Sequence, residues 1–136
     1  MTTYALDTNI ISYMLKKDQE VIDRFRREST LGNEFVMLPV VYYEVTRWLY
    51  EKKATRLLSE FNDLCVEIPM LETTIAIWNK AAELYVLTRQ KGKTVGGDAD
   101  LLIAAYCLMN GCTLITNNIR HFEIIDDLNI GNWKNV

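Results

Sequence analysis

The feature that most constrains the fold is a carboxylate placed directly after a short apolar segment near the N-terminus. Tyr4, Ala5 and Leu6 precede Asp7, and small polar residues that can open a helix follow it. This order is typical of a buried β-strand, and in open α/β sheets the carboxyl ends of the strands form the edge where ligands bind. A carboxylate beside a core strand is costly unless a positive charge compensates it. We therefore expect a cationic partner for Asp7.

Length and composition predict a single globular domain over residues 1–136. A chain of 136 residues, 49% hydrophobic and 24% charged, is long enough to bury a core. It has no apolar run near the roughly 20 residues that cross a bilayer and no basic signal-peptide segment. The three cysteines, without a Cys-x-x-Cys pair, suit a reducing compartment. We expect a cytoplasmic protein with no membrane contact. The net charge of −3 argues against a general nucleic-acid binder but permits a local or metal-bridged contact.

Strand-like and helical segments alternate along the chain, which predicts an α/β fold with a parallel sheet covered on both faces. The strand patterns lie near residues 3–7, 35–38, 65–68 and 112–116, with a short edge strand near 128–133. The helical patterns lie near residues 9–16, 19–28, 39–52, 54–64, 73–90 and 98–110. In the segment 73–90 the apolar stripe consists of Ile75, Trp78, Ala82, Tyr85 and Val86. We expect four to five strands. Several aromatic residues of the helices could form partner surfaces, but their helical spacing predicts that they are buried or half-buried: Tyr42, Tyr43, Trp48, Tyr50 and Trp78.

Four acids fall at points that a parallel sheet would bring to one edge. Asp7 ends the first strand, Glu44 follows the second strand early in a helix, and Asp98 and Asp100 open a later helix. Each has an ordinary structural explanation, such as helix capping for Asp98. Several carboxylates at one edge instead indicate a divalent cation, because oxygen ligands suit Mg²⁺ or Mn²⁺, and such ions serve phosphoryl chemistry.

Polar residues beside these acids are candidates for a supporting role. Thr116, Asn117 and Asn118 follow a predicted strand and should reach the same edge, where they could position water or a phosphate. Threonine and asparagine are also common in plain turns. Thr8 and Asn9 directly follow Asp7 and are supporting candidates of the same kind.

Four motifs carry a family resemblance by their order along the chain. They are Leu-Asp-Thr-Asn-Ile-Ile-Ser at 6–12, Glu-Val at 44–45, Ala-Asp-Leu-Leu-Ile-Ala-Ala at 99–105 and Leu-Ile-Thr-Asn-Asn-Ile-Arg-His-Phe at 114–122. This set resembles the PIN-domain nucleases, and in particular the VapC toxins of type II toxin–antitoxin pairs. The resemblance implies a PIN-like three-layer α/β/α fold and a Mg²⁺- or Mn²⁺-dependent endoribonuclease that hydrolyses RNA phosphodiester bonds. It also implies a cognate antitoxin that covers the site, and a homodimer.

The resemblance also assigns roles to individual acids. It matches Asp7, Glu44 and Asp100 to the catalytic, metal-binding acids of the family, with Asp98 as an additional candidate ligand. Many relatives carry a fourth acid just after the last threonine, where this chain has Asn117 and Asn118. His121 stands where an acid often precedes phenylalanine. These departures argue against a tightly held second metal ion.

Other classes of protein share parts of this pattern. A phosphatase that starts with strand-Asp-x-Asp needs a second aspartate where Asn9 stands, and a receiver-type signalling domain needs a lysine where Asn117 and Asn118 stand. The alternative that remains is a catalytically weak PIN-like module that binds RNA or a protein partner, which the missing fourth acid favours. Metal-dependent cleavage by the pure protein would separate it from the nuclease.

Overall fold

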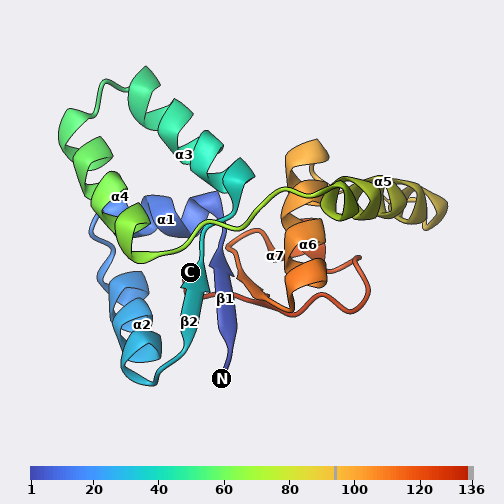
Figure 1. Ribbon diagram of the computed structural model, residues 1–136, viewed down its shortest axis with the longest axis horizontal. Coiled ribbons are helices and arrows are strands. Elements are labelled where there is room, and N and C mark those ends of the chain that lie inside the picture. The colour runs from blue at the N-terminus through green and yellow to red at the C-terminus, as the bar shows by residue number, and fades with distance from the viewer. Residues whose placement is uncertain (94, 135–136) are drawn as a thin grey trace.

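A parallel β-sheet of strand order β2-β1-β3-β4 forms the centre of the fold (Figure 1). The structure is a computed structural model that describes residues 1–93 and 95–134. Within these residues the strands are β1 (Thr3–Leu6), β2 (Glu34–Val36), β3 (Thr113–Ile115) and β4 (Ile130–Gly131). In the register, Leu6 of β1 lies opposite Ile115 of β3, and every pair of neighbouring strands is parallel. The predicted α/β class, the parallel sheet and the short edge strand are therefore confirmed.

Helices lie on both sides of the sheet, which gives the α/β/α layering (Figure 1). On one side are α1 (Thr8–Leu15), α2 (Gln19–Thr30), α3 (Pro39–Glu51) and α4 (Thr55–Glu67), and on the other are α5 (Ile75–Gln90) and α6 (Asp98–Asn110). The short α7 (Ile119–Phe122) follows β3. Local sequence explains most of the boundaries. Asp18 and Thr74 cap α2 and α5 by accepting hydrogen bonds from backbone N–H groups, and Pro39 occupies the first turn of α3.

One predicted strand is wrong. The segment 65–68 is predicted to be extended, but α4 continues through Glu67 and the chain bends at Ile68. Only an isolated parallel bridge between Met37 and Met70 follows. The short apolar run cannot distinguish a strand from the last turn of a helix. Val66 is 84% exposed, whereas Ile68 just after the helix is buried in the core, so the run does not alternate as a half-buried strand would.

The predicted buried stripe of α5 is also wrong. The side chains that pack inward from α5 are Ile77, Ala81, Leu84 and Thr88, while the predicted stripe faces outward. This helix is apolar on two faces, so its periodicity alone cannot decide which face meets α6. Among the aromatic residues, Tyr42 and Trp48 are half-buried as predicted, but Tyr43, Tyr50 and Trp78 are exposed.

The core holds β1 and β3 between α1 and α6. Ile10 of α1, Ile103 of α6 and Leu114 of β3 are fully buried, and burying each such side chain stabilises the fold by about 1.5–3 kcal/mol. This packing places the carboxyl ends of β1 and β3 beside the first turns of α1 and α6.

Among the described residues, none of the helices combines the length and the hydrophobicity that a membrane span requires.

Candidate active site

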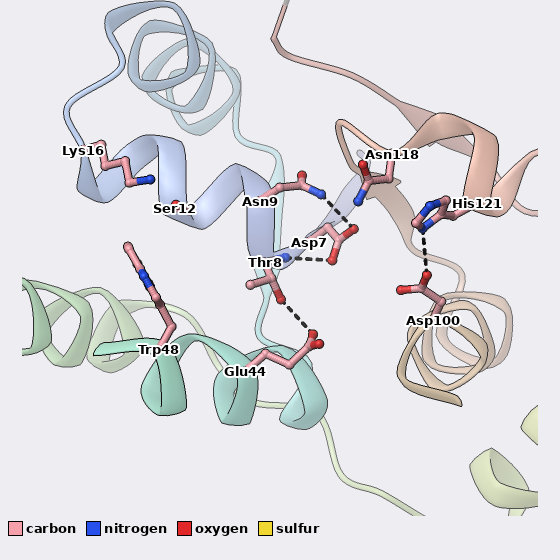
Figure 2. A pocket seen from close by; sticks show the side chains of 10 residues that line it. All are labelled: Asp7, Thr8, Asn9, Ser12, Lys16, Glu44, Trp48, Asp100, Asn118 and His121. Atoms are coloured by element: carbon pink, nitrogen blue, oxygen red, sulfur yellow. Dashed lines mark hydrogen bonds and ion pairs between the residues drawn. The ribbon is translucent and has the colours of Figure 1, made fainter. Parts of the chain in front are cut away.

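A pocket of about 390 Å³ opens at the carboxyl edge of the sheet. It is lined by all three acids that the sequence resemblance to the family assigned to the metal site, Asp7, Glu44 and Asp100. Figure 2 shows Asp7 at its centre, with Glu44 and Asp100 on opposite sides. The residues that line the pocket are Asp7, Thr8, Asn9, Ser12, Lys16, Glu44, Trp48, Asp100, Asn118 and His121. They come from α1, α3, α6 and the segment around α7, so the tertiary fold assembles the pocket from four distant parts of the chain.

Asp7 is the most buried acid of the pocket, with 5% of its surface exposed. One carboxylate oxygen, Oδ1, accepts a hydrogen bond from the backbone N–H of Thr8 at 2.7 Å. The other, Oδ2, accepts from the Thr116 hydroxyl at 2.7 Å and the Asn9 amide at 3.3 Å. Asp7 thus caps α1 while its backbone N–H continues the sheet hydrogen bonding to Ile115.

The electrostatic environment of Asp7 disfavours its charge. Burial raises the pKa of Asp7, and the neighbouring carboxylates of Asp100 and Glu44 raise it further, whereas the hydrogen bonds from Thr116 and Thr8 oppose this rise. Among the described residues, no lysine or arginine forms an ion pair with Asp7. The cationic partner that the sequence led us to expect is therefore not a basic side chain of this part of the protein.

Neighbouring residues hold the two other acids of the pocket. Glu44 is half-buried on α3 and its Oε1 accepts a hydrogen bond from the Thr8 hydroxyl at 2.9 Å. Asp100 lies in the first turn of α6, and its Oδ2 is 3.0 Å from Nδ1 of His121. The backbone at Gly96 closes over that contact, because a Cβ at this position would collide with Asp100 Oδ2 and lie 2.7 Å from His121 Nδ1.

The residues predicted to support the acids have different roles in the structure. Thr8, Asn9 and Asn118 line the pocket, whereas Thr116 is fully buried beneath it and holds Asp7. The backbone N–H of Asn118 donates to the Thr116 hydroxyl at 3.0 Å. Asn117 does not line the pocket, because its side chain donates to the Tyr13 hydroxyl and its backbone donates to Asn9.

Asp98 is not brought to the acidic pocket. It is exposed and lines a separate groove with Trp78, Tyr85 and Leu101. Asp98 and Asp100 are two positions apart on α6, and such residues point in different directions from a helix. The suggestion that Asp98 assists the other acids therefore has no support in the geometry.

Four pocket residues were missed as site candidates: Ser12, Lys16, Trp48 and His121. A signal for three of them was present in the sequence. Thr8, Ser12 and Lys16 are spaced four apart along one helix, as are Glu44 and Trp48 along another, so each set shares a helix face. For His121, the only signal was its position in place of a family acid.

The donor set of the pocket suits a divalent cation. It offers carboxylate oxygens from Asp7, Glu44 and Asp100, of the kind that Mg²⁺ and Mn²⁺ prefer. No group of three or more His, Cys, Asp or Glu side chains among the described residues is already arranged to hold an ion. Glu44 and Asp100 would therefore have to turn from their hydrogen bonds with Thr8 and His121 toward Asp7 to share one.

A parallel sheet covered by helices, with an acidic pocket at the carboxyl edge of its strands, places the protein in the class of α/β proteins that bind ligands at this edge. The PIN domain family profile matches residues 4–128. The chain therefore belongs to the PIN domain family, whose nucleases generally use divalent metal ions.

Named relatives and solved structures resemble the chain over nearly its whole length. It is 28% identical to "Ribonuclease VapC2" of Rickettsia felis, across 96% of this chain and 97% of the relative. It is 25% identical to "tRNA(fMet)-specific endonuclease VapC" of Shigella flexneri, across 98% of this chain and 100% of the relative. The structure of VapBC2 from Rickettsia felis bound to a promoter DNA fragment matches with a TM-score of 0.87 and 26% identity, covering 98% of this chain and 100% of the other. VapBC-1 from nontypeable Haemophilus influenzae matches with a TM-score of 0.83 and 27% identity, covering 97% and 98%.

Proposed function

We propose that this protein is a metal-dependent endoribonuclease that acts in the cytoplasm as the toxin of a toxin–antitoxin pair. The observation that carries the proposal is the buried Asp7 carboxylate, which faces Glu44 and Asp100 in one pocket and has no basic partner among the described residues. The names of the relatives, which are VapC ribonucleases and a tRNA endonuclease, support RNA as the substrate.

In this proposal Asp7, Glu44 and Asp100 would hold Mg²⁺ or Mn²⁺. When bound, such an ion lowers the pKa of water and stabilises the negative charge that develops on a phosphate. A cation beside Asp7 would favour the ionised form of a carboxylate whose pKa is raised by burial.

The chain's own residues orient these acids. Thr116 and the backbone N–H of Thr8 fix the two oxygens of Asp7, so this carboxylate is held before any ligand arrives. In the structure the Thr8 hydroxyl and His121 hold Glu44 and Asp100 at the two sides of the pocket, and these two contacts would break when the acids turn toward a shared ion. Asn118 lines the pocket beside His121 (Figure 2), where its side-chain amide is available to donate to a phosphate oxygen.

The substitution Asp7→Asn tests the proposal. It preserves the shape of the side chain but removes the central charge, so we expect RNA cleavage to fall by roughly 100-fold or more, as for loss of a central catalytic group. Cleavage of RNA by the pure protein in Mg²⁺ or Mn²⁺ is the measurement, and EDTA should abolish it. The matched control is Asp98→Asn, outside the pocket, which should retain activity. Equal cleavage by Asp7→Asn, or cleavage in EDTA, would contradict a metal-dependent nuclease built on Asp7, and a lack of any cleavage by the wild type would favour the weakly catalytic binding module.

We also propose that a cognate antitoxin controls the protein by placing a basic side chain in the acidic pocket. The solved relatives named VapBC support a partner, and an arginine fork can pair with carboxylates through two hydrogen bonds. The double substitution Asp7→Asn/Asp100→Asn should therefore weaken antitoxin binding by about tenfold or more in a calorimetric titration. Equal affinity for the wild type and the double variant would show that the antitoxin binds elsewhere.

A further inference from the structure

The acidic pocket continues as a groove between α1 and α3, and its far end is basic and aromatic. It is lined by Thr8 and Ser12 of α1, by Lys16 at the C-terminal end of this helix, and by Glu44 and Trp48 of α3. Figure 2 shows the two helix faces opposite each other, with Thr8 facing Glu44 near Asp7, and Lys16 facing Trp48 further along. The groove therefore changes from carboxylates at one end to a cation beside an indole ring at the other.

Lys16 and Trp48 contact each other across the groove. The Lys16 amine lies 5.3 Å from the centre of the Trp48 ring. Among the described residues, Lys16 forms no ion pair with a carboxylate, whereas the adjacent Lys17 pairs with Glu60 at 3.2 Å. Trp48 is half-buried, with part of the ring packed against the core and part lining the groove.

We propose that Lys16 and Trp48 form a nucleotide-binding subsite for single-stranded RNA, next to the acidic pocket. The indole stacks on a base, and the lysine pairs with a phosphate of the same strand. This inference rests on the proposed ribonuclease function and specifies how its substrate is held. Aromatic stacking together with a basic group is the usual means of binding single strands without strong sequence preference.

The charges of the groove explain why such a subsite is needed. The carboxylates of Asp7, Glu44 and Asp100 repel a polyanion. Among the described residues, Lys16 is the only lysine or arginine that lines this pocket. At 1.5 Å per helical residue, Lys16 lies roughly 14 Å along α1 from Asp7, a distance that a strand of a few nucleotides can follow. The long, flexible lysine side chain can leave the ring for a phosphate, which exposes the indole to a base.

Binding of RNA to an inactive background separates this subsite from catalysis. The probe is a labelled 12-nucleotide single-stranded RNA of mixed sequence, titrated against Asp7→Asn by fluorescence anisotropy. Adding Lys16→Met or Trp48→Leu should raise Kd by about tenfold. The matched controls Lys17→Met and Trp78→Leu should change Kd by less than about twofold, because neither residue lines the groove. Lys16→Met should also reduce the slope of log K against log salt by about 0.7.

Three further measurements distinguish a subsite from a structural role. RNA should quench tryptophan fluorescence, and the quenching should be lost in Trp48→Leu but not in Trp78→Leu. The conservative variant Trp48→Phe, which retains a stacking ring and most of the packing, should restore most of the affinity. In the active protein, Lys16→Met should raise KM with little change in kcat.

Unchanged Kd for both Lys16→Met and Trp48→Leu would overturn the subsite, while loss of cleavage in Asp7→Asn would still support the ribonuclease. Absence of metal-dependent cleavage in every preparation would instead contradict the proposed function. If Trp48→Leu does not fold, the Kd and the salt dependence of Lys16→Met still test the subsite. If the Lys16 and Trp48 substitutions weaken antitoxin binding but leave RNA binding unchanged, the surface belongs to the protein partner and the proposal is wrong.

Discussion

Asp7 concentrates the electrostatic cost of the pocket in one side chain. Its carboxylate is buried and lies near Glu44 and Asp100, yet hydrogen bonds from Thr116 and Thr8 hold it in place. The folded protein therefore retains a proton on Asp7 more readily than the unfolded chain does. Such a residue lowers stability when it ionises without a cation, which is characteristic of sites arranged for a ligand rather than for folding.

The pH dependence of stability should show this cost. Because burial raises the pKa of Asp7, the folded protein binds more protons than the unfolded chain between about pH 4 and the raised pKa, so stability falls as pH rises through this interval. Asparagine does not ionise. In EDTA, the melting temperature of Asp7→Asn should therefore increase relative to that of the wild type as pH rises. The difference should reach about a few degrees at pH values above the raised pKa of Asp7. A difference in melting temperature that is constant from pH 3 to pH 8 would contradict this.

At the scale of elements, Gly96 lies just before α6 and packs closely against Asp100 of α6 and His121 of α7. Gly96 leaves no room for a Cβ beside Asp100 and His121. Gly96→Ala should displace one of these side chains and lower RNA cleavage by roughly tenfold or more, because small misplacements of reacting groups are costly. The comparison is Gly92→Ala, where nothing lies within 4 Å but φ is +73°. That variant should lose stability and keep its activity, so equal activity losses in the two variants would contradict the steric explanation.

At the scale of the whole molecule, α5 presents an exposed apolar stripe, and part of it lines the groove between α5 and α6. Ile75, Trp78, Tyr85 and Val86 are all exposed, and exposed patches of this kind mark interaction surfaces. The resemblance to VapC toxins implies a homodimer, and we expect this stripe to meet its copy in a second chain. Trp78→Glu should then convert a dimer into a monomer in light scattering coupled to size-exclusion chromatography. An unchanged mass for Trp78→Glu would place the interface elsewhere.

The sequence by itself determined the fold class, the parallel sheet and the three acids. Strands that alternate with helices leave few topologies, and the acids after β1 and β2 and at the start of α6 must fall at the carboxyl edge of such a sheet. The shared pocket of Asp7, Glu44 and Asp100 follows from this arrangement. Their roles, and the single domain over residues 1–136, stay predictions.

Only the tertiary structure decided which face of each element is used. In the structure the predicted α5 stripe faces outward, and α4 continues through the expected strand. Asp100 lines the acidic pocket whereas Asp98 does not, and the Thr116 hydroxyl donates a hydrogen bond to Asp7. The tertiary structure also placed Lys16 and Trp48 opposite each other, although they belong to different helices. Periodicity identifies which residues share a helix face, but packing against other elements decides what that face meets, and this information is not local to the sequence.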